Sequence, residues 1–241
     1  MNFFFKIISK IFPYSLLFKI LRRLISGKVN SMNLELALKE LLVFDNYLKN
    51  EIASVGTSIG GGKHIKHEIM KYHRFFSQNI LPNQRVLDVG CGNAFLAISV
   101  LKDVDCKITG VEICNSNFKL AKKNTKHTSI KIIQADATKF KYKNSFDIII
   151  LSNVLEHIKN RVSFLKTLKT QVKPKKILIR VPILQRDWTV LKKKEIGVEW
   201  RLDNTHEIEY TKENFEKEML DAGLKIKKIE FIWSEIWCVL A

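Results

Sequence analysis

Cysteine is scarce in this chain, and no two cysteines are closely spaced. The 241 residues include four cysteines, with neither a C-x-x-C pair nor the Cys/His spacing of a zinc site: Cys91, Cys106, Cys114 and Cys238. This pattern excludes a disulfide framework and a structural zinc site, so we predict no metal site and a reducing, cytoplasmic environment. A chain of this length can form one α/β domain with an appendage.

Acidic residues are absent from the first 28 positions, and the whole chain has a formal net charge of +17. The segment also lacks the run of about 20 apolar residues that would cross a bilayer. Lys6 and Lys10 interrupt the apolar core that a signal peptide requires. Pro13 predicts a break into two short helices. On the second helix, apolar residues share one face, flanked by cations: Leu16, Leu17, Ile20, Leu21 and Leu24, beside Lys19, Arg22 and Arg23.

This pattern is typical of a helix that lies in a membrane interface, where its cations meet anionic lipid. We therefore predict that residues 1–30 form a basic amphipathic segment and that residues 1–28 bind an anionic membrane surface. The protein would then be cytoplasmic and peripheral on the membrane. The alternative is a helical cap packed on the domain or on a second subunit.

A glycine-rich stretch at residues 54–64 lacks the features of a phosphate-binding P-loop. The residue after its lysine is His64, where the motif requires Ser or Thr, and no strand precedes it. We interpret it as a flexible loop between two helices, at residues 32–52 and 64–80. Residues 31–82 are thus predicted to form a helical cap before the main domain.

From residue 85 onward, short apolar strands alternate with helices. Strands are predicted over residues 85–90, 107–113, 130–136, 146–152, 175–182, 225–233 and 236–241, and helices over 94–102, 117–124, 162–172 and 212–222. The alternation predicts an α/β fold with a mostly parallel sheet and helices on both faces. The two consecutive final strands indicate an antiparallel pair, and a long loop is predicted over residues 183–210.

The stretch VLDVGCGNA, residues 86–94, has two glycines of a nucleotide-binding turn but lacks the third glycine of a dinucleotide fingerprint. Phe95 stands where G-x-G-x-x-G requires glycine. Asp88 precedes the turn, and its carboxylate would repel a pyrophosphate but attract an ammonium or a sulfonium group. The sign of this charge favours S-adenosylmethionine over a dinucleotide.

Two further acids follow later strands. Glu112 ends the second predicted strand, where a carboxylate can accept hydrogen bonds from a ribose diol. Asp136 ends the third, where it can accept from an adenine amino group. With Asp88, they place three acids at the carboxyl ends of successive strands, which is the edge where open α/β sheets bind ligands.

Four stretches resemble the class I S-adenosylmethionine-dependent methyltransferases in order and spacing, over residues 83–241: VLDVGCGNA, GVEIC, QADATKF and FDIIILSNVLEHI. The resemblance implies a Rossmann-like, seven-stranded, mostly parallel sheet whose last strand is antiparallel, with S-adenosylmethionine as the cofactor. It assigns the methionine end to Asp88, Gly90, Gly92 and Asn93, the ribose and adenine to Glu112, Ile113, Asp136 and Ala137, and the neighbourhood of the methyl group to Asn153.

The chain lacks the [DNS]-P-P-[YFW] motif of many nucleic-acid and protein-glutamine methyltransferases, because it reads SNVLEH at that place. A Pro-Cys nucleophile for cytosine methylation is also missing. The basic charge is therefore the only feature that supports an RNA substrate. LSNVLEHI resembles a small-molecule branch that includes quinone and sugar enzymes. Residues 180–226 resemble methyltransferases associated with polysaccharide and lipid-glycan assembly.

Methylation of a hydroxyl requires the loss of its proton, so a nearby base assists it. His157 and His206 are the candidate bases, and Asp203 is a candidate to orient His206. The alternative roles are a helix-start residue and a loop-anchoring hydrogen bond. Four residues are candidates for closing over the cofactor or stacking on a sugar, with plain packing as the alternative: Tyr72, His73, Trp188 and Trp200.

The sequence therefore predicts a methyltransferase that acts on a hydroxyl or carboxyl of a sugar or lipid-linked intermediate near the membrane. Two alternatives remain. One is an RNA methyltransferase that uses the basic surface, and the other is a non-catalytic, methyltransferase-like subunit that binds a partner.

Overall fold

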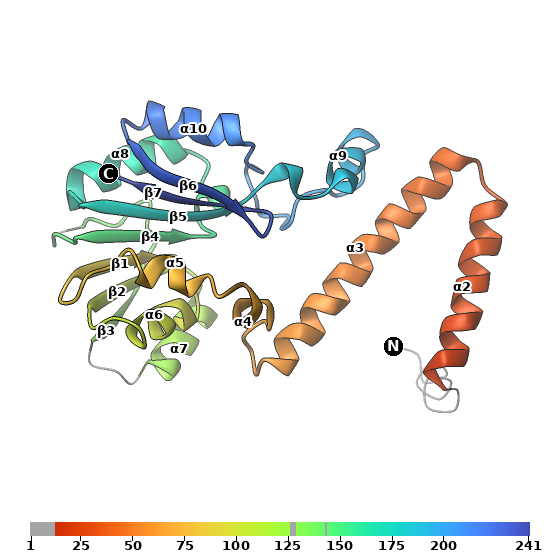
Figure 1. Cartoon of the computed structure of the whole chain (residues 1–241), viewed down its shortest axis with the longest axis horizontal. Helices are drawn as coiled ribbons and strands as arrows, with labels where there is room; N and C mark the ends of the chain where they lie inside the picture. The colour runs from red at the N-terminus through yellow and green to blue at the C-terminus, as the bar shows by residue number, and fades with distance from the viewer. Residues whose placement is uncertain (1–12, 126–128, 143) are drawn as a thin grey trace.

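Seven strands form one sheet in the order β3-β2-β1-β4-β5-β7-β6 (Figure 1). In this computed structural model, which describes residues 13–125, 129–142 and 144–241, β1 to β5 pair in parallel, and β7 is antiparallel to β5 and β6. The strands are β1 (Arg85–Val89), β2 (Lys107–Glu112), β3 (Ile130–Gln134), β4 (Ile148–Ser152), β5 (Lys176–Pro182), β6 (Ile226–Ile232) and β7 (Glu235–Leu240). The predicted Rossmann-like, seven-stranded sheet with an antiparallel last strand is confirmed.

Helices cover both faces of the sheet, so its central strands are apolar on both sides. One core contains Leu168 and Met219, and the other contains Phe76, Ala97 and Ala121. Central parallel strands buried on both faces consist of nearly continuous apolar runs, as Ile148–Leu151 of β4 illustrate. The covering helices are α5 (His73–Ser77), α6 (Phe95–Leu101) and α7 (Asn115–Asn124) on one face, and α8 (Arg161–Val172) and α10 (Lys212–Asp221) on the other.

The glycine-rich stretch is largely helical, contrary to the prediction of a loop. Helix α3 runs over Leu34–Ile59, past the predicted end at residue 52. In its last turns the hydroxyls of Thr57 and Ser58 donate to the carbonyl oxygens four residues earlier, so these polar groups are satisfied within the helix. Gly56 packs against His64, whose ring would lie 3.1 Å from an added Cβ.

Two other predicted boundaries are wrong. The helix expected over residues 64–80 divides into α4 (Lys66–Met70) and α5, because Lys71 takes a left-handed conformation with φ 48°. The loop expected over residues 183–210 contains a one-turn helix, η2 (Leu184–Arg186), and α9 (Trp188–Glu195). Asp187 caps α9 by accepting a hydrogen bond from the Thr189 amide.

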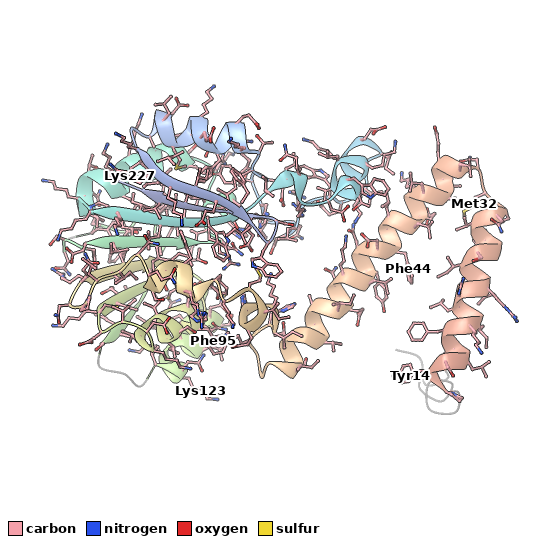
Figure 2. All side chains as sticks on the ribbon, in the orientation of Figure 1. Tyr14, Met32, Phe44, Phe95, Lys123 and Lys227 are labelled. Carbon is pink, nitrogen blue, oxygen red and sulfur yellow. The ribbon has the colours of Figure 1, made fainter. Side chains whose placement is uncertain are left out.

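Helices α2 (Tyr14–Asn30) and α3 form a hairpin that extends from the sheet, with α2 the farther of the two (Figure 1). No residue of α2 is buried, and its side chains project along the whole helix (Figure 2). The helix predicted to follow Pro13 is present, whereas the one predicted before it lies outside the described residues. Within the described part of the chain, no helix is both long and apolar enough to cross a membrane.

Helix α3 of the hairpin contacts the segment after β5, both in α9 and just beyond it. The buried Lys193 ammonium donates to Asp45 and, at 2.8 Å, to the Asn46 side chain, both on α3. The Asn46 amide donates in turn to the Glu199 carbonyl oxygen at 2.7 Å. The segment after β5 is therefore held between the sheet and α3.

Candidate functional site

A cavity of about 730 Å³ opens at the carboxyl ends of β1 to β4. A smaller cavity of about 190 Å³ adjoins it and shares Gly90, Gly92 and Asn153 with it. The predicted cofactor residues all line one or both cavities: Gly90, Gly92, Glu112, Ile113, Asp136, Ala137 and Asn153 the larger, and Asp88 and Asn93 the smaller. The sheet thus brings together residues that lie as far as 65 positions apart, from Asp88 to Asn153.

The turn after β1 depends on its two glycines. Gly90 has φ +66° and Gly92 has φ +56°, in the region that L side chains rarely adopt. A Cβ at Gly90 would lie 2.6 Å from Val154 Cγ2, whereas one at Gly92 would meet nothing within 4 Å. The turn after β1 is therefore packed at Gly90 against the side chain of Val154, which follows β4.

Two buried polar atoms near this turn have no protein partner. Asp88 Oδ2 and Asn153 Oδ1 are fully covered and accept no hydrogen bond within the described chain. Burial raises the pKa of Asp88 to about 7, with a further contribution from the nearby Glu112 carboxylate. Acceptors that are buried and unpaired suit a cationic donor such as the ammonium of S-adenosylmethionine.

The two other predicted acids already accept hydrogen bonds from the backbone. The amides of Gly92 and Cys114 donate to the Glu112 carboxylate at 2.8 and 2.7 Å. Asp136 accepts from the amide and the hydroxyl of Thr138, and mainly the hydroxyl bond lowers its pKa. These bonds fix the direction of both carboxylates at the edge of the larger cavity. Each Glu112 oxygen accepts one bond and retains a lone pair. Both Thr138 bonds end on Asp136 Oδ1, so the remaining capacity of Asp136 is on Oδ2, which lies 3.5 Å from the Lys139 ammonium.

A buried ion pair that the sequence analysis missed forms the wall of the smaller cavity. Arg180 of β5 donates two hydrogen bonds to Glu235 of β7, and its guanidinium lies 4.0 Å from the ring centre of Tyr72. Tyr72 and Arg180 both line the cavity, while His73 lines neither. The available signal was one arginine inside the apolar strand KILIRVP.

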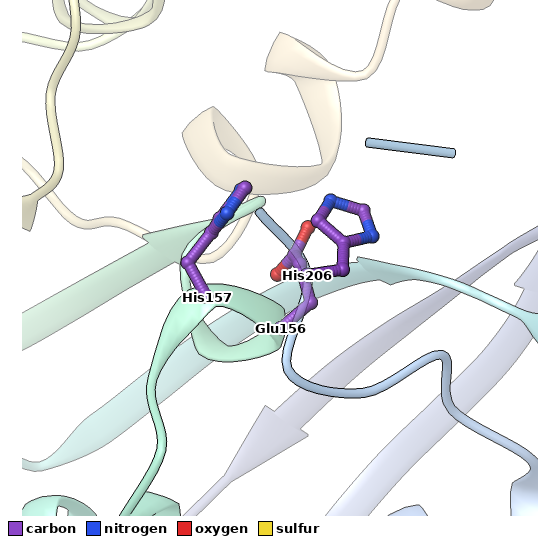
Figure 3. A group of neighbouring side chains, drawn as sticks. All are labelled: Glu156, His157 and His206. Carbon is purple, nitrogen blue, oxygen red and sulfur yellow. The ribbon is translucent and has the colours of Figure 1, made fainter. Parts of the chain in front are cut away.

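Glu156, His157 and His206 form a compact group, called the histidine group below (Figure 3). One potential ligand atom from each lies within 4.8 Å of the other two. Glu156 and His157 belong to the one-turn helix η1 (Leu155–His157) after β4, and His206 lies on the segment after α9. His157 lines the cavity together with Asn153. The two predicted bases are therefore neighbours, and their ring centres lie 4.6 Å apart.

Glu156 is the member of this group that sequence reasoning missed. Its side chain is 0% exposed, and neither carboxylate oxygen has a hydrogen-bond partner in the described chain. Burial raises its pKa to about 7. The only indication in the sequence is its place in LSNVLEHI, next to a histidine, and nothing there indicates that the side chain is buried.

The hydrogen bonds of the two histidines fix their tautomers. Thr205 uses its one hydroxyl proton on Asp203, at 2.7 Å, so it accepts from His157 Nδ1, at 2.9 Å. His206 Nδ1 lies 2.8 Å from Glu209. Burial alone would raise the pKa of Glu209, but the bonds from His206 and the Leu202 amide lower it overall, so the carboxylate accepts. In its neutral form, each imidazole therefore carries its proton on Nδ1 and its free lone pair on Nε2.

The prediction that the Asp203 side chain orients His206 is wrong. Asp203 accepts from the amide and hydroxyl of Thr205 and so acts on His157 instead. The carboxylate that orients His206 is Glu209, which also pairs with Arg186. Glu209 lies close to His206 because the segment after α9 folds back on itself.

The two tryptophans lie apart from the larger cavity. Trp188 starts α9 and is 68% exposed. Trp200 lines a hollow with His206 and Glu209, and the Lys194 ammonium lies 4.7 Å from its ring centre. Trp200 is thus near the group of Glu156, His157 and His206. Trp188 lines neither of the two cavities nor the hollow.

Comparison with known proteins identifies the family of the chain. A family model described as a methyltransferase domain matches residues 62–229. The ubiquinone biosynthesis O-methyltransferase of Bradyrhizobium diazoefficiens is 30% identical over 62% of this chain and 62% of its own length. That of Rickettsia canadensis is 28% identical over 63% of this chain and 67% of its own. The chain thus spans about three fifths to two thirds of the length of these relatives.

Solved structures share the fold at low identity. The Haloferax volcanii complex of the Trm112 methyltransferase activator with a methyltransferase gives a TM-score of 0.64 at 11% identity, covering 79% of this chain and 97% of that chain. A SAM-dependent methyltransferase from Aquifex aeolicus gives 0.59 at 14%, covering 80% and 98%. The chain belongs to the methyltransferase domain family and has the class I fold, in which S-adenosylmethionine is the methyl donor.

Proposed function

We propose that this protein methylates a hydroxyl group on a small acceptor, a saccharide or lipid-linked saccharide that it meets near a membrane surface. The observation that carries the proposal is the group of Glu156, His157 and His206 beside the cofactor cavity. A hydroxyl must lose its proton to become a good nucleophile, and this group offers the means. The O-methyltransferases among the relatives support the reaction class.

The cofactor would occupy the larger cavity with its methionine end toward Asp88. In this proposal Asp88 and Asn153 accept from the ammonium, and the Gly90–Asn93 turn contacts the methionine carboxylate. Glu112 accepts from the ribose diol, and the remaining predicted residues hold the adenine: Ile113, Asp136 and Ala137. When bound, the cofactor supplies an activated methyl group and leaves as a neutral thioether.

The acceptor would approach from the side of His157 and Trp200. His157 is the exposed member of the histidine group, and Trp200 lies in the hollow that also contains His206. Tyr72 is buried and faces Arg180, so its role would be to close the wall near the cofactor rather than to touch the acceptor. A role for His73 or Trp188 in substrate contact remains a prediction.

The membrane part of the proposal rests on α2. Its exposed apolar side chains include Phe18, Ile20 and Leu24, it carries Lys19, Arg22 and Arg23, and it contains no acid. A helix of this composition binds interfaces by burying apolar area while its cations attract anionic lipid. It would bring the site to acceptors that are anchored in lipid.

The test is incubation of the full chain with methyl-labelled S-adenosylmethionine and a fractionated cell extract. Label in the lipid or glycan fraction, lost with the His157→Ala variant, supports the proposal. Label only in RNA overturns it in favour of an RNA methyltransferase. Absence of label in every fraction, with cofactor binding intact by calorimetry, overturns it in favour of a non-catalytic subunit.

A further inference from the structure

We propose that Glu156, His157 and His206 bind a divalent transition-metal cation, which in turn binds the hydroxyl oxygen of the acceptor. The cation site itself rests on the geometry of the three side chains. Its role toward the acceptor rests on the proposed function. The sequence predicted no metal site, because Glu156 and His157 are separated from His206 by about 50 residues and match no ligand spacing.

The carboxylate of Glu156 is buried without a partner of its own among the described residues. A fully covered carboxylate is costly unless it is paired, hydrogen-bonded or bound to a metal. Both of its oxygens lack a partner in the described chain, although the side chain is 0% exposed. Arg180 attracts a charge there, but its guanidinium donates its hydrogen bonds to Glu235 and Ser152 instead. A cation between Glu156, His157 and His206 would pair with the carboxylate directly.

The two imidazoles are oriented as metal-binding histidines are. Each ring donates its Nδ1 proton to a fixed acceptor, His157 to Thr205 and His206 to Glu209. The free lone pair of each ring is therefore on Nε2. A metal-bound histidine characteristically donates its other nitrogen to a carboxylate or another oxygen in this way, which fixes the ring and raises its basicity. Glu209 also binds Arg186, so its own position is fixed.

The ligand types indicate the class of metal. Two imidazoles and one carboxylate suit Zn²⁺, Fe²⁺, Co²⁺ or Mn²⁺, whereas Mg²⁺ and Ca²⁺ prefer oxygen ligands alone. Three protein ligands also leave at least one position open, as in catalytic rather than structural zinc sites. His157 is exposed and lines the cofactor cavity, so an acceptor can reach that open position.

A cation at this place would change how the acceptor loses its proton. The hydroxyl oxygen would bind the open position, its pKa would fall, and its proton would pass to solvent water. The resulting oxygen would then be held beside Asn153, at the edge of the cofactor cavity. His157 and His206 would act as ligands rather than as free bases.

Metal binding is tested directly on the full chain after dialysis against a chelator. Zn²⁺ and Mg²⁺ are titrated by calorimetry, and Co²⁺ by its visible absorption. We expect one equivalent of Zn²⁺ or Co²⁺ to bind, with Mg²⁺ weaker. Glu156→Gln and His206→Ala should each weaken Zn²⁺ binding at least tenfold. Glu207→Gln, an adjacent exposed residue with the same loss of charge, is the matched control and should bind normally.

The same preparations are titrated with S-adenosylmethionine. Normal cofactor binding without Zn²⁺ or Co²⁺ binding overturns the metal site and leaves the methyltransferase proposal standing. Binding of Zn²⁺ that is equal in Glu156→Gln, His206→Ala and the control also overturns it. Loss of label transfer after chelation, restored by Zn²⁺, Co²⁺ or Mn²⁺, supports the role toward the acceptor, and transfer unaffected by chelation overturns that role.

Discussion

His206 Nδ1 lies 2.8 Å from a carboxylate oxygen of Glu209, and both side chains are buried. Glu209 has two further partners, the guanidinium of Arg186 and the Leu202 amide. The ring of His206 is therefore held by a carboxylate that cannot itself turn away. This arrangement makes Glu209 a positioning residue for the group beside the cofactor cavity.

Glu209→Gln is expected to reduce methyl transfer and Zn²⁺ affinity about 10- to 100-fold, the usual effect of losing an outer partner of a ligating histidine. The amide can still accept a hydrogen bond, but it no longer favours the Nδ1 proton electrostatically. Label transfer and calorimetry on the same sample measure the two effects. Glu199→Gln, an exposed residue paired with Arg201, is the control. Equal methyl transfer and equal Zn²⁺ affinity in the two variants would contradict the positioning role of Glu209.

Cofactor affinity should depend on pH through Asp88. Its pKa is raised to about 7 by burial, so the carboxyl is partly protonated near neutral pH before the cofactor binds. A cationic ligand prefers the carboxylate, so the affinity should be full above pH 7 and fall by up to about tenfold per unit as the pH decreases below it. Calorimetry between pH 5.5 and 7.5 measures this slope.

Asp88→Asn serves as the control for that slope. The variant should bind S-adenosylmethionine weakly at every pH in the range and with little pH dependence, because no carboxyl at position 88 titrates. A wild-type affinity that stays constant from pH 5.5 to 7.5 would contradict the role given to Asp88.

Gly90→Ala should destabilise the protein more than Gly92→Ala does. Both positions have positive φ, which costs a non-glycine residue about 1–3 kcal/mol. At Gly90 the new methyl group would also meet Val154 Cγ2, at 2.6 Å. Urea unfolding measures the difference. A second change, Val154→Ala, should recover part of the loss in Gly90→Ala, and similar stabilities for the two alanine variants would exclude the steric term.

Glu235→Gln is expected to lower the free energy of unfolding by about 3–5 kcal/mol, because it leaves the guanidinium of Arg180 buried without a counter-charge. Glu230→Gln, on the neighbouring strand, removes a more exposed pair with Lys228 and should cost about 0–1 kcal/mol. Both are measured by urea unfolding. An equal decrease in the free energy of unfolding in both variants would contradict the larger effect assigned to the buried Arg180 pair.

Binding of α2 to membranes is tested by co-sedimentation with vesicles of phosphatidylglycerol and phosphatidylcholine. Ile20→Gln together with Leu24→Gln removes apolar area without changing the charge and should weaken binding about tenfold or more. The matched control is Ser15→Gln together with Ser26→Gln on the same helix. Unchanged sedimentation of the Ile20 and Leu24 variant would contradict the membrane proposal.

The sheet and its ligand-binding edge could be predicted from local pattern. Each of the seven predicted strands is present, because a buried parallel strand requires an apolar run and leaves a clear signal in the sequence. The turn at Gly90 and the acids at Asp88, Glu112 and Asp136 could be placed at one edge, because consecutive parallel strands end on the same side. These residues do line the two cavities.

The histidine group could be predicted only in part. His157 and His206 were chosen for their chemistry, but their contact depends on how the segment after β5 folds back over η1. That segment is held by long-range partners, such as Lys193 with Asp45, which lie 148 residues apart. No local pattern carries such information, and so Glu156, Glu209 and α9 were missed.

The position of β7 has a consequence for synthesis of the chain. β7 pairs with β5 on one side and β6 on the other, yet it follows both in sequence. Until residues 235–240 leave the ribosome, β5 is an open edge, β6 has no neighbour, and Arg180 has no Glu235. Nascent chains that stall before this strand would expose a template for aggregation. Completion of the sheet is thus a late event, and chaperone dependence should be greatest just before it.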